Sequence, residues 1–226
     1  MADAEASQKK SDLPVRFASA VVMLAVAGSA LWAGGNLWAI FVMTVGAICA
    51  VEFAQLNSKA FGSRIANVPM LIFGAGYIAI GVWTLVTLPM AVVLGILAVV
   101  IATDVGAYFS GRSFGGPKIA PSISPSKTWA GLIGGMLAAG LVAGASFVWN
   151  TGAFVLRPML FIAFGIGAVL AVLAQMGDFF ESWLKRKAGV KDSSNLIPGH
   201  GGVFDRVDGL LPVAIASGLL WAIHPA

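Results

Sequence analysis

The chain has 226 residues, of which 58% are hydrophobic and only 11% charged, with a formal net charge of +4 at pH 7. Soluble domains are about 45–50% apolar, so this composition excludes an ordinary soluble fold. It also excludes a nucleic-acid-binding domain, which needs a basic face on a soluble fold. Cys49 is the only cysteine, so no intrachain disulfide can form. The sequence predicts an integral membrane protein.

Long apolar runs follow one another along the whole chain. A helix needs about 20 predominantly apolar residues to cross the hydrocarbon core. By this criterion we predict one domain (1–226), an all-α polytopic bundle of about seven transmembrane helices. The first span has no convincing cleavage site and is expected to be retained. The predicted spans are 15–33, 37–55, 67–83, 90–108, 129–149, 156–176 and 204–223.

Two features of these spans leave alternatives open. Only "TLVTLP" separates the third span from the fourth, so a re-entrant pair is the alternative to two separate spans. The fifth span contains two GxxxG pairs, Gly131 with Gly135 and Gly140 with Gly144. Such small residues let helices approach closely in lipid, either within one chain or in a homodimer.

Basic residues predict the orientation. With seven spans and a cytoplasmic N-terminus, every Lys and Arg except Arg157 falls on the cytoplasmic side. This asymmetry is what the positive-inside rule requires. We therefore expect one strongly charged face, at the cytoplasmic surface of the membrane.

Several acidic residues lie toward the cytoplasmic ends of the predicted spans. Glu52, Asp104 and Asp178 lie toward the predicted cytoplasmic ends of the second, fourth and sixth spans. A charge near the bilayer is costly, which makes each a candidate for function. The alternative is that such a residue only terminates a span at the headgroups. For Glu52 the two interpretations are equally supported, because no neighbouring residues in the sequence suggest a catalytic or binding role.

Two helix ends are predicted to bring four carboxylates to the same depth. In "AQMGDFFES", Asp178 and Glu181 share a helix face. The last apolar run is too short to cross the membrane unless its helix begins near Val203, which places Asp205 and Asp208 on one face of its first turns. Mg²⁺ typically takes one or two carboxylates together with substrate phosphates and water. The sequence therefore predicts a magnesium site.

Around these acids lies a polar segment, 181–209, rich in groups that bind phosphate. Glycines in "PGHGG" let main-chain N–H groups approach an anion. The alternative is a solvated basic loop that enforces topology and attracts anionic lipid. The cationic candidates are Lys185, Arg186, Lys187, Lys191 and Arg206, and His200 lies between glycines.

A second polar segment, 103–131, faces the same side. It carries Asp104, Arg112 and Lys118, and "SPSKTW" precedes the fifth span, where a helix N-terminus favours anions. The spacing of a P-loop is absent. An ordinary solvated loop is an equal alternative for this segment. Together the two segments suit phosphoryl or nucleotidyl transfer, in which positioning and charge neutralisation dominate.

The segment "SWLKRKAGVKDSSNLIPGHGGVFDRVD" resembles the signature of the phosphatidate cytidylyltransferases, or CDP-diacylglycerol synthases. It has the Ser, the Lys-Arg, the Lys-Asp, the Pro before His-Gly-Gly and the final Asp-Arg-x-Asp. "DVGAYFSGRSFGG", "SPSKTWAG" and "GDFFES" also resemble family segments. The resemblance is strong over a catalytic half at about 100–210, whereas the N-terminal spans are similar only in hydrophobicity.

This resemblance implies a Mg²⁺-dependent reaction of CTP with phosphatidate that yields CDP-diacylglycerol and pyrophosphate. It implies Asp178 and Asp205 as metal ligands, with a monovalent cation such as K⁺ as a further candidate. Lys191, Arg206 and His200 join these two as catalytic candidates. The substrate-binding candidates are Asp104, Ser124, Lys127, Thr128, Lys185, Arg186, Gly201, Gly202 and Asp208.

The expected location is a bacterial inner (plasma) membrane, with the site facing the cytoplasm and the phosphatidate tails remaining in lipid. Three other readings compete. A CTP-dependent polyprenol or phytol kinase would release CDP. An ion-coupled transporter would place charges near the bilayer midplane and show inverted repeats. A purely structural membrane protein would not bind CTP.

Overall fold

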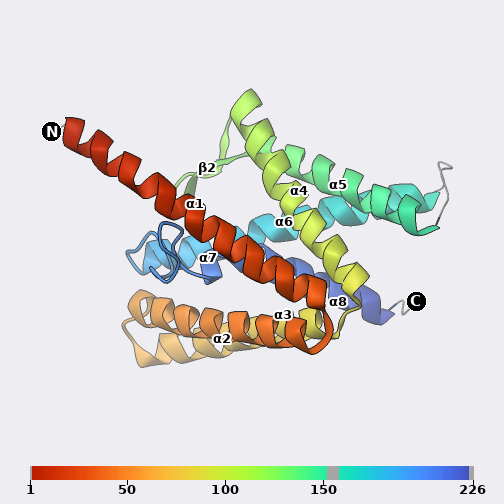
Figure 1. The fold of residues 1–226 in the computed structure, drawn as a ribbon, viewed down its shortest axis with the longest axis horizontal. Coiled ribbons are helices and arrows are strands. Elements are labelled where there is room, and N and C mark those ends of the chain that lie inside the picture. Colours follow the sequence, from red (N-terminus) through yellow and green to blue (C-terminus); the bar gives the residue numbers. More distant parts are fainter. Residues whose placement is uncertain (1, 152–157, 224–226) are drawn as a thin grey trace.

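The computed structural model describes residues 2–151 and 158–223. This part of the chain forms helices and one short two-stranded antiparallel sheet (Figure 1). In chain order the elements are α1 (Ala2–Ala33), α2 (Gly35–Ala60), α3 (Arg64–Thr87), α4 (Met90–Phe114), β1 (Lys118–Ala120), β2 (Ser124–Thr128), α5 (Trp129–Thr151), α6 (Pro158–Lys187), α7 (Phe204–Val207) and α8 (Leu210–Ile223).

Six of the described helices, α1 to α6, are long and apolar enough to cross a membrane. This confirms the prediction of a polytopic helical membrane protein. The third and fourth predicted spans are two separate helices of 24 and 25 residues, joined at Leu88 and Pro89. At about 1.5 Å per residue each is long enough to cross the membrane, as the prediction of two separate spans requires. Arg157, the one basic residue expected on the opposite side, lies outside the described residues.

The seventh predicted span differs from the expectation. Instead of one helix over 204–223, the chain forms the four-residue α7 and the 14-residue α8. Helix α8 is shorter than the length that a membrane crossing normally needs. Pro212 explains the break, because it lacks the N–H that would bond to the Asp208 carbonyl in a continuous helix. Asp208 and Gly209 therefore form a turn between the two helices.

Glycines allow α5 to pack closely against both α4 and α6. A Cβ built on Gly135 would lie 3.0 Å from the Thr103 carbonyl oxygen of α4. A Cβ on Gly140 would meet the Phe164 ring of α6 at 2.7 Å. Both GxxxG pairs of α5 thus face helices of the same chain, which is the first of the two alternatives left open by the sequence.

Helix α1 lies apart from the other spans and crosses the face of the bundle in Figure 1. Its membrane-spanning stretch is not buried by the rest of the chain. The turn into α2 consists of Gly34 and Gly35, with φ of +63° and +50°. Glycine is suited to both positions, because other residues rarely adopt this left-handed conformation.

The polar connections gather at one end of the molecule. Figure 1 shows the turn between α2 and α3, the connection after α6, and α7 at the end toward which α1 projects its N-terminus. Beneath this end lies a cluster of buried apolar side chains from α2, α3, α6, α7 and α8, including Phe53, Leu184 and Phe204. These helices therefore pack against one another beneath the charged segment.

Candidate active site

The segment that follows α6 is folded into a tight turn. Ile197 and Gly201 form an isolated antiparallel bridge, and the His200 N–H donates to the Ile197 carbonyl at 2.9 Å. Gly199 and Gly201 have φ of +75° and +85°, which other residues rarely adopt. The glycines of "PGHGG" are thus required by the turn itself.

Glu52 of α2 accepts hydrogen bonds from two parts of this segment, Ser193–Ser194 and Val203–Phe204. Its Oε1 accepts hydrogen bonds from the Ser194 hydroxyl (2.6 Å) and the Val203 N–H (3.1 Å). Its Oε2 accepts from the Phe204 N–H (2.7 Å) and the Ser193 hydroxyl (3.2 Å). The Glu52 side chain is buried. Neither alternative drawn from the sequence described this arrangement, in which a carboxylate from an early helix anchors a late loop.

Asp205 of α7 is surrounded by donors. Its Oδ2 accepts from the Ser193 N–H (2.8 Å), the Ser193 hydroxyl (2.7 Å) and the Gly202 N–H (2.8 Å), and its Oδ1 accepts from Lys185 Nζ (2.6 Å). Burial alone would raise the pKa of Asp205. Hydrogen bonds with Glu181, Lys185, Gly202 and Ser193 outweigh burial and lower this pKa to about 2. Asp205 is therefore ionised at any physiological pH.

Helix α6 presents three charged side chains to the same space. Lys185 bridges Asp205 and Glu181, whose Oε2 lies 2.8 Å from its Nζ. Asp178, two turns earlier than Lys185, forms an ion pair with Lys127 of β2 and accepts a 3.2 Å hydrogen bond from the Ser182 hydroxyl. The sequence prediction that Asp178 and Glu181 share a face is confirmed.

Asp208 reaches the same space from the turn before α8. A Cβ on Gly177 would collide with the Asp208 carbonyl and lie 2.8 Å from Pro212 Cγ, so the glycine lets this turn pack directly on α6. Burial and the nearby charge of Asp178 raise the pKa of Asp208 to about 6. Asp208 therefore keeps its proton to a higher pH than Asp205 does.

These side chains line a cavity of about 320 Å³, here called the acidic cavity. Its walls carry six carboxyl groups and two basic side chains, together with apolar residues of α4, α6 and α8. The charged residues are Asp104, Asp178, Glu181, Asp192, Asp205, Asp208, Lys185 and Arg206. Asp192 was not among the sequence candidates, although it belongs to the Lys-Asp pair of the signature.

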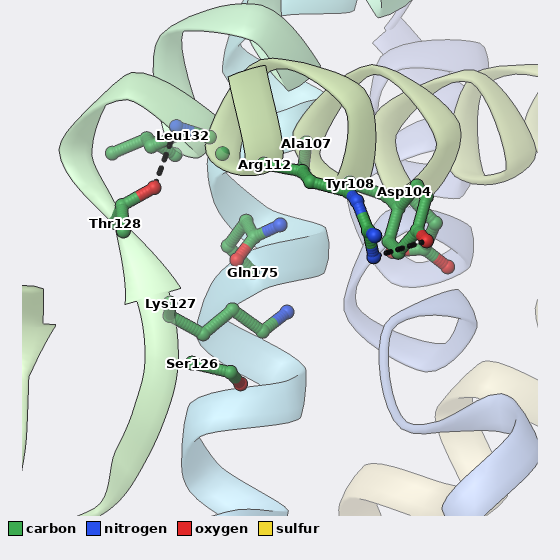
Figure 2. A pocket seen from close by; sticks show the side chains of 11 residues that line it. Asp104, Ala107, Tyr108, Arg112, Ser126, Lys127, Thr128, Leu132 and Gln175 are labelled. Carbon is green, nitrogen blue, oxygen red and sulfur yellow. Dashed lines mark hydrogen bonds between the residues drawn. The ribbon is translucent and has the colours of Figure 1, made fainter. Parts of the chain in front are cut away.

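A second cavity, of about 350 Å³, lies between α4, β2, α5 and α6 and is here called the α4–α5 cavity (Figure 2). Asp104 lines both cavities. Lys127 lines the α4–α5 cavity, and its ammonium group pairs with Asp178 of the acidic cavity. The two spaces are therefore neighbours, joined through Asp104 and the pair of Lys127 with Asp178.

Comparison with known proteins bears on this geometry. A family model described as the cytidylyltransferase family matches residues 64–224, which include both cavities. The chain belongs to the cytidylyltransferase family. It is similar to proteins named phosphatidate cytidylyltransferase, with 32% identity to that of Brucella suis over 94% of both chains. Identity is 34% to that of Rickettsia felis over 92% of both chains, and 48% to that of Haemophilus influenzae over 52% of this chain and 41% of that one.

Three other predicted substrate-binding residues of this cytidylyltransferase lie in the β-hairpin or contact it. The Thr128 hydroxyl accepts a 3.0 Å hydrogen bond from the Gly131 N–H and so caps α5, while still lining the α4–α5 cavity. Ser124 is buried and lines neither of the two cavities described above. Arg186 is exposed and donates from Nε to the Ile123 carbonyl at 3.4 Å, which ties α6 to the β-hairpin.

The remaining predicted residues lie on the loop before α7, except Arg206, which lies within α7. His200 Nδ1 is 2.9 Å from the Ser19 hydroxyl of α1, and Arg206 donates to the His200 carbonyl at 2.8 Å. The Gly202 N–H is used by Asp205, and Gly201 packs against the same carboxylate. Lys191 is exposed and lines neither of the two cavities. Of the five predicted catalytic residues, three line the acidic cavity: Asp178, Asp205 and Arg206.

The carboxyl groups of the acidic cavity are the residues that could hold a divalent cation. Its carboxyl groups outnumber its basic groups, and Glu181 Oε1 is buried without a hydrogen-bond partner in the described part of the chain. No group of three or more His, Cys, Asp or Glu among the described residues is arranged to hold a metal ion alone. Two carboxylates are sufficient for Mg²⁺ when substrate phosphates and water complete its coordination. The donor set therefore fits.

Proposed function

We propose that this cytidylyltransferase transfers a cytidylyl group from CTP to phosphatidate, releasing pyrophosphate and forming CDP-diacylglycerol. We further propose that it acts at the cytoplasmic face of a bacterial inner membrane. The observation that carries the proposal is the acidic cavity, in which Asp178 and Asp205 are each paired with a lysine at one end of a membrane bundle. The names of the similar proteins support the same reaction.

In this nucleotidyl transfer the main task of the protein is to position the phosphate groups of the two substrates. A phosphatidate oxygen is already anionic, so it can attack the α-phosphorus of CTP without a strong general base, and the bond to pyrophosphate breaks on the opposite side. Lys185 and Arg206 line the acidic cavity and Lys127 pairs with its Asp178, so these three cations would bind phosphate oxygens. Mg²⁺ held by Asp178 and Asp205 would supply neutralisation of the charge that develops on the leaving pyrophosphate.

The four donors around Asp205 support this role for it. They fix the orientation of the carboxylate and keep it ionised, so its charge is in place before substrate arrives. Lys185 and Lys127 neutralise the two carboxylates in the meantime. Lys185 and Lys127 would then bind phosphate oxygens of the substrate, and Asp178 and Asp205 would be the residues that hold Mg²⁺.

The position of the cavity also suits a lipid substrate. Val100 of α4 and Leu210 of α8 line the acidic cavity alongside the carboxylates, so its wall changes from polar to apolar. We propose that the phosphatidate headgroup enters at this boundary while its acyl chains stay in the bilayer. An ion-coupled carrier is disfavoured, because such proteins hold their charges near the bilayer midplane, whereas these charges collect at one end.

The test uses purified protein in detergent with CTP, Mg²⁺ and phosphatidate, comparing the wild type with Asp205→Asn. Pyrophosphate and CDP-diacylglycerol should both form with the wild type and neither with the folded variant. Release of CDP without pyrophosphate would instead identify a CTP-dependent lipid kinase. A folded wild type that yields no product would refute the proposed reaction.

A further inference from the structure

Gln175 of α6 is a buried polar side chain that lines a cavity. It is 4% exposed and lines the α4–α5 cavity. Among the described residues its carboxamide has no hydrogen-bond partner. Buried polar groups in proteins are nearly always paired, so an unpaired one that faces a cavity points to a ligand.

The cavity that Gln175 faces is polar on several sides. In Figure 2 the Gln175 carboxamide rises from α6 into the space that Lys127 of β2 also faces, with Arg112 of α4 on the other side. Arg112 Nη1 donates to the Tyr108 hydroxyl at 3.3 Å, which holds the guanidinium at this wall. The volume of about 350 Å³ is at the small end of the range for ligand pockets, about 300–1,000 Å³. It suits one nucleoside.

Because the two cavities are neighbours, one ligand could occupy both of them. Lys127 and Asp104 connect the α4–α5 cavity with the acidic cavity. A molecule with phosphates among the lysines and carboxylates of the acidic cavity can thus extend its other end toward Gln175. For a nucleoside triphosphate, that other end is the base.

We infer that Gln175 reads the Watson–Crick edge of the cytosine of CTP, with the α4–α5 cavity as the nucleoside subsite. A carboxamide presents one acceptor and one donor side by side. Cytosine presents the complementary pair, the exocyclic N4 amine as donor and the adjacent ring N3 as acceptor. The amide oxygen accepts from N4–H, and the amide N–H donates to N3. This inference rests on the proposed function only in taking CTP as the nucleotide.

The experiment measures binding of CTP to detergent-purified protein by equilibrium dialysis, without phosphatidate, for the wild type and Gln175→Met. Methionine keeps a similar length and removes both polar groups. A bidentate amide–base pair corresponds to about a 5- to 150-fold rise in Kd on its loss. The matched control is Gln55→Met on α2, where the glutamine is exposed and away from both cavities, and it should bind as the wild type does.

A second ligand tests the role of the base edge. The triphosphate of 2-pyrimidinone ribonucleoside lacks the exocyclic amine of cytosine. It should bind the wild type more weakly than CTP, whereas Gln175→Met should bind the two nucleotides nearly alike, because the two deletions remove the same contact. Thermal unfolding in detergent confirms that the variant is folded.

The outcomes separate this inference from the proposed reaction. CTP binding that depends on Gln175 and the amine, in a protein that makes no CDP-diacylglycerol, would leave the subsite standing and remove the reaction. Additive losses in the variant and the analogue, or a Gln175→Met protein that binds CTP normally, would overturn the subsite. Wild-type protein that binds no CTP would also overturn it. An activity assay in which only the KM for phosphatidate rises would assign Gln175 to the lipid instead.

Discussion

The clearest consequence of the structure concerns Glu52, which touches none of the reacting groups. We expect Glu52→Gln to reduce kcat/KM for CDP-diacylglycerol formation by about 100-fold or more, with the protein still folded. Each carboxylate oxygen of Glu52 accepts two hydrogen bonds, one of them from a backbone N–H of Val203 or Phe204. In Glu52→Gln an amide NH₂ group replaces one of these oxygens. This group is itself a donor, so it cannot accept the hydrogen bonds that the oxygen accepted.

The magnitude follows from these four contacts. One buried backbone N–H loses its acceptor, at a cost of about 1–3 kcal/mol, and the bonds that remain lose the advantage of a charged acceptor, about 1 kcal/mol each. The total is about 3–5 kcal/mol. It is the amount by which the observed conformation of the 188–203 loop, which positions Asp205, would be destabilised. Each ~1.4 kcal/mol corresponds to a tenfold change in rate. Ser194→Ala removes a single donor and should cost only about tenfold in kcat/KM.

The assay combines kinetics with a probe of the loop itself. Pyrophosphate release gives kcat/KM, and limited trypsin digestion at the exposed Lys191 reports whether the loop is held. Glu52→Gln should be cleaved there faster than the wild type, and Ser194→Ala should lie between them. A folded Glu52→Gln protein with kcat/KM within twofold of the wild type would refute the reasoning, because the loop would then not depend on α2.

Three further outcomes are expected. Gly177→Ala should lower activity, since its Cβ would collide with the Asp208 carbonyl, whereas Gly165→Ala in the same helix meets no atom within 4 Å and should be silent. The raised pKa of Asp208 adds stability that is fully present below its unfolded pKa of about 3.8 and lost as pH rises through about 6. Asp208→Asn should therefore weaken the fall in Tm between about pH 4 and pH 6.5, and an unchanged fall would contradict this assignment. Removing Mg²⁺ with EDTA should stop pyrophosphate release and excess Mg²⁺ should restore it; activity that persists in EDTA would show that the carboxylates act without a metal.

Sequence patterns predicted the six long spans because a membrane crossing has a simple length and composition criterion. The same criterion predicted one last helix over 204–223, which was wrong. Pro212 interrupts that helix because proline has no backbone N–H, and hydropathy does not measure backbone hydrogen bonding. Asp178 and Asp205 were found by their position at helix ends. These are local properties, readable from neighbouring residues.

The supports of the site could not be predicted in this way. Glu52 meets Ser193 across 141 positions of the chain, and Ser19 meets Pro198 across 179. No periodicity or short motif connects positions so far apart, so Glu52 looked isolated in the sequence. Gln175 was passed over for a related reason: one glutamine in an apolar run carries no signal until its cavity is seen.

The long reach between Glu52 and its partners has a consequence for how the protein is made. At about 5–20 residues per second, synthesis adds the 141 residues between Glu52 and Ser193 in about 7–28 s. During that interval α2 has a carboxylate whose four donors do not yet exist. A chain cut short before Ser193 never supplies them, so damage to the last sixth of the protein also leaves its second helix incompletely packed. Glu52 thereby makes the stability of the early helices depend on completion of the late ones.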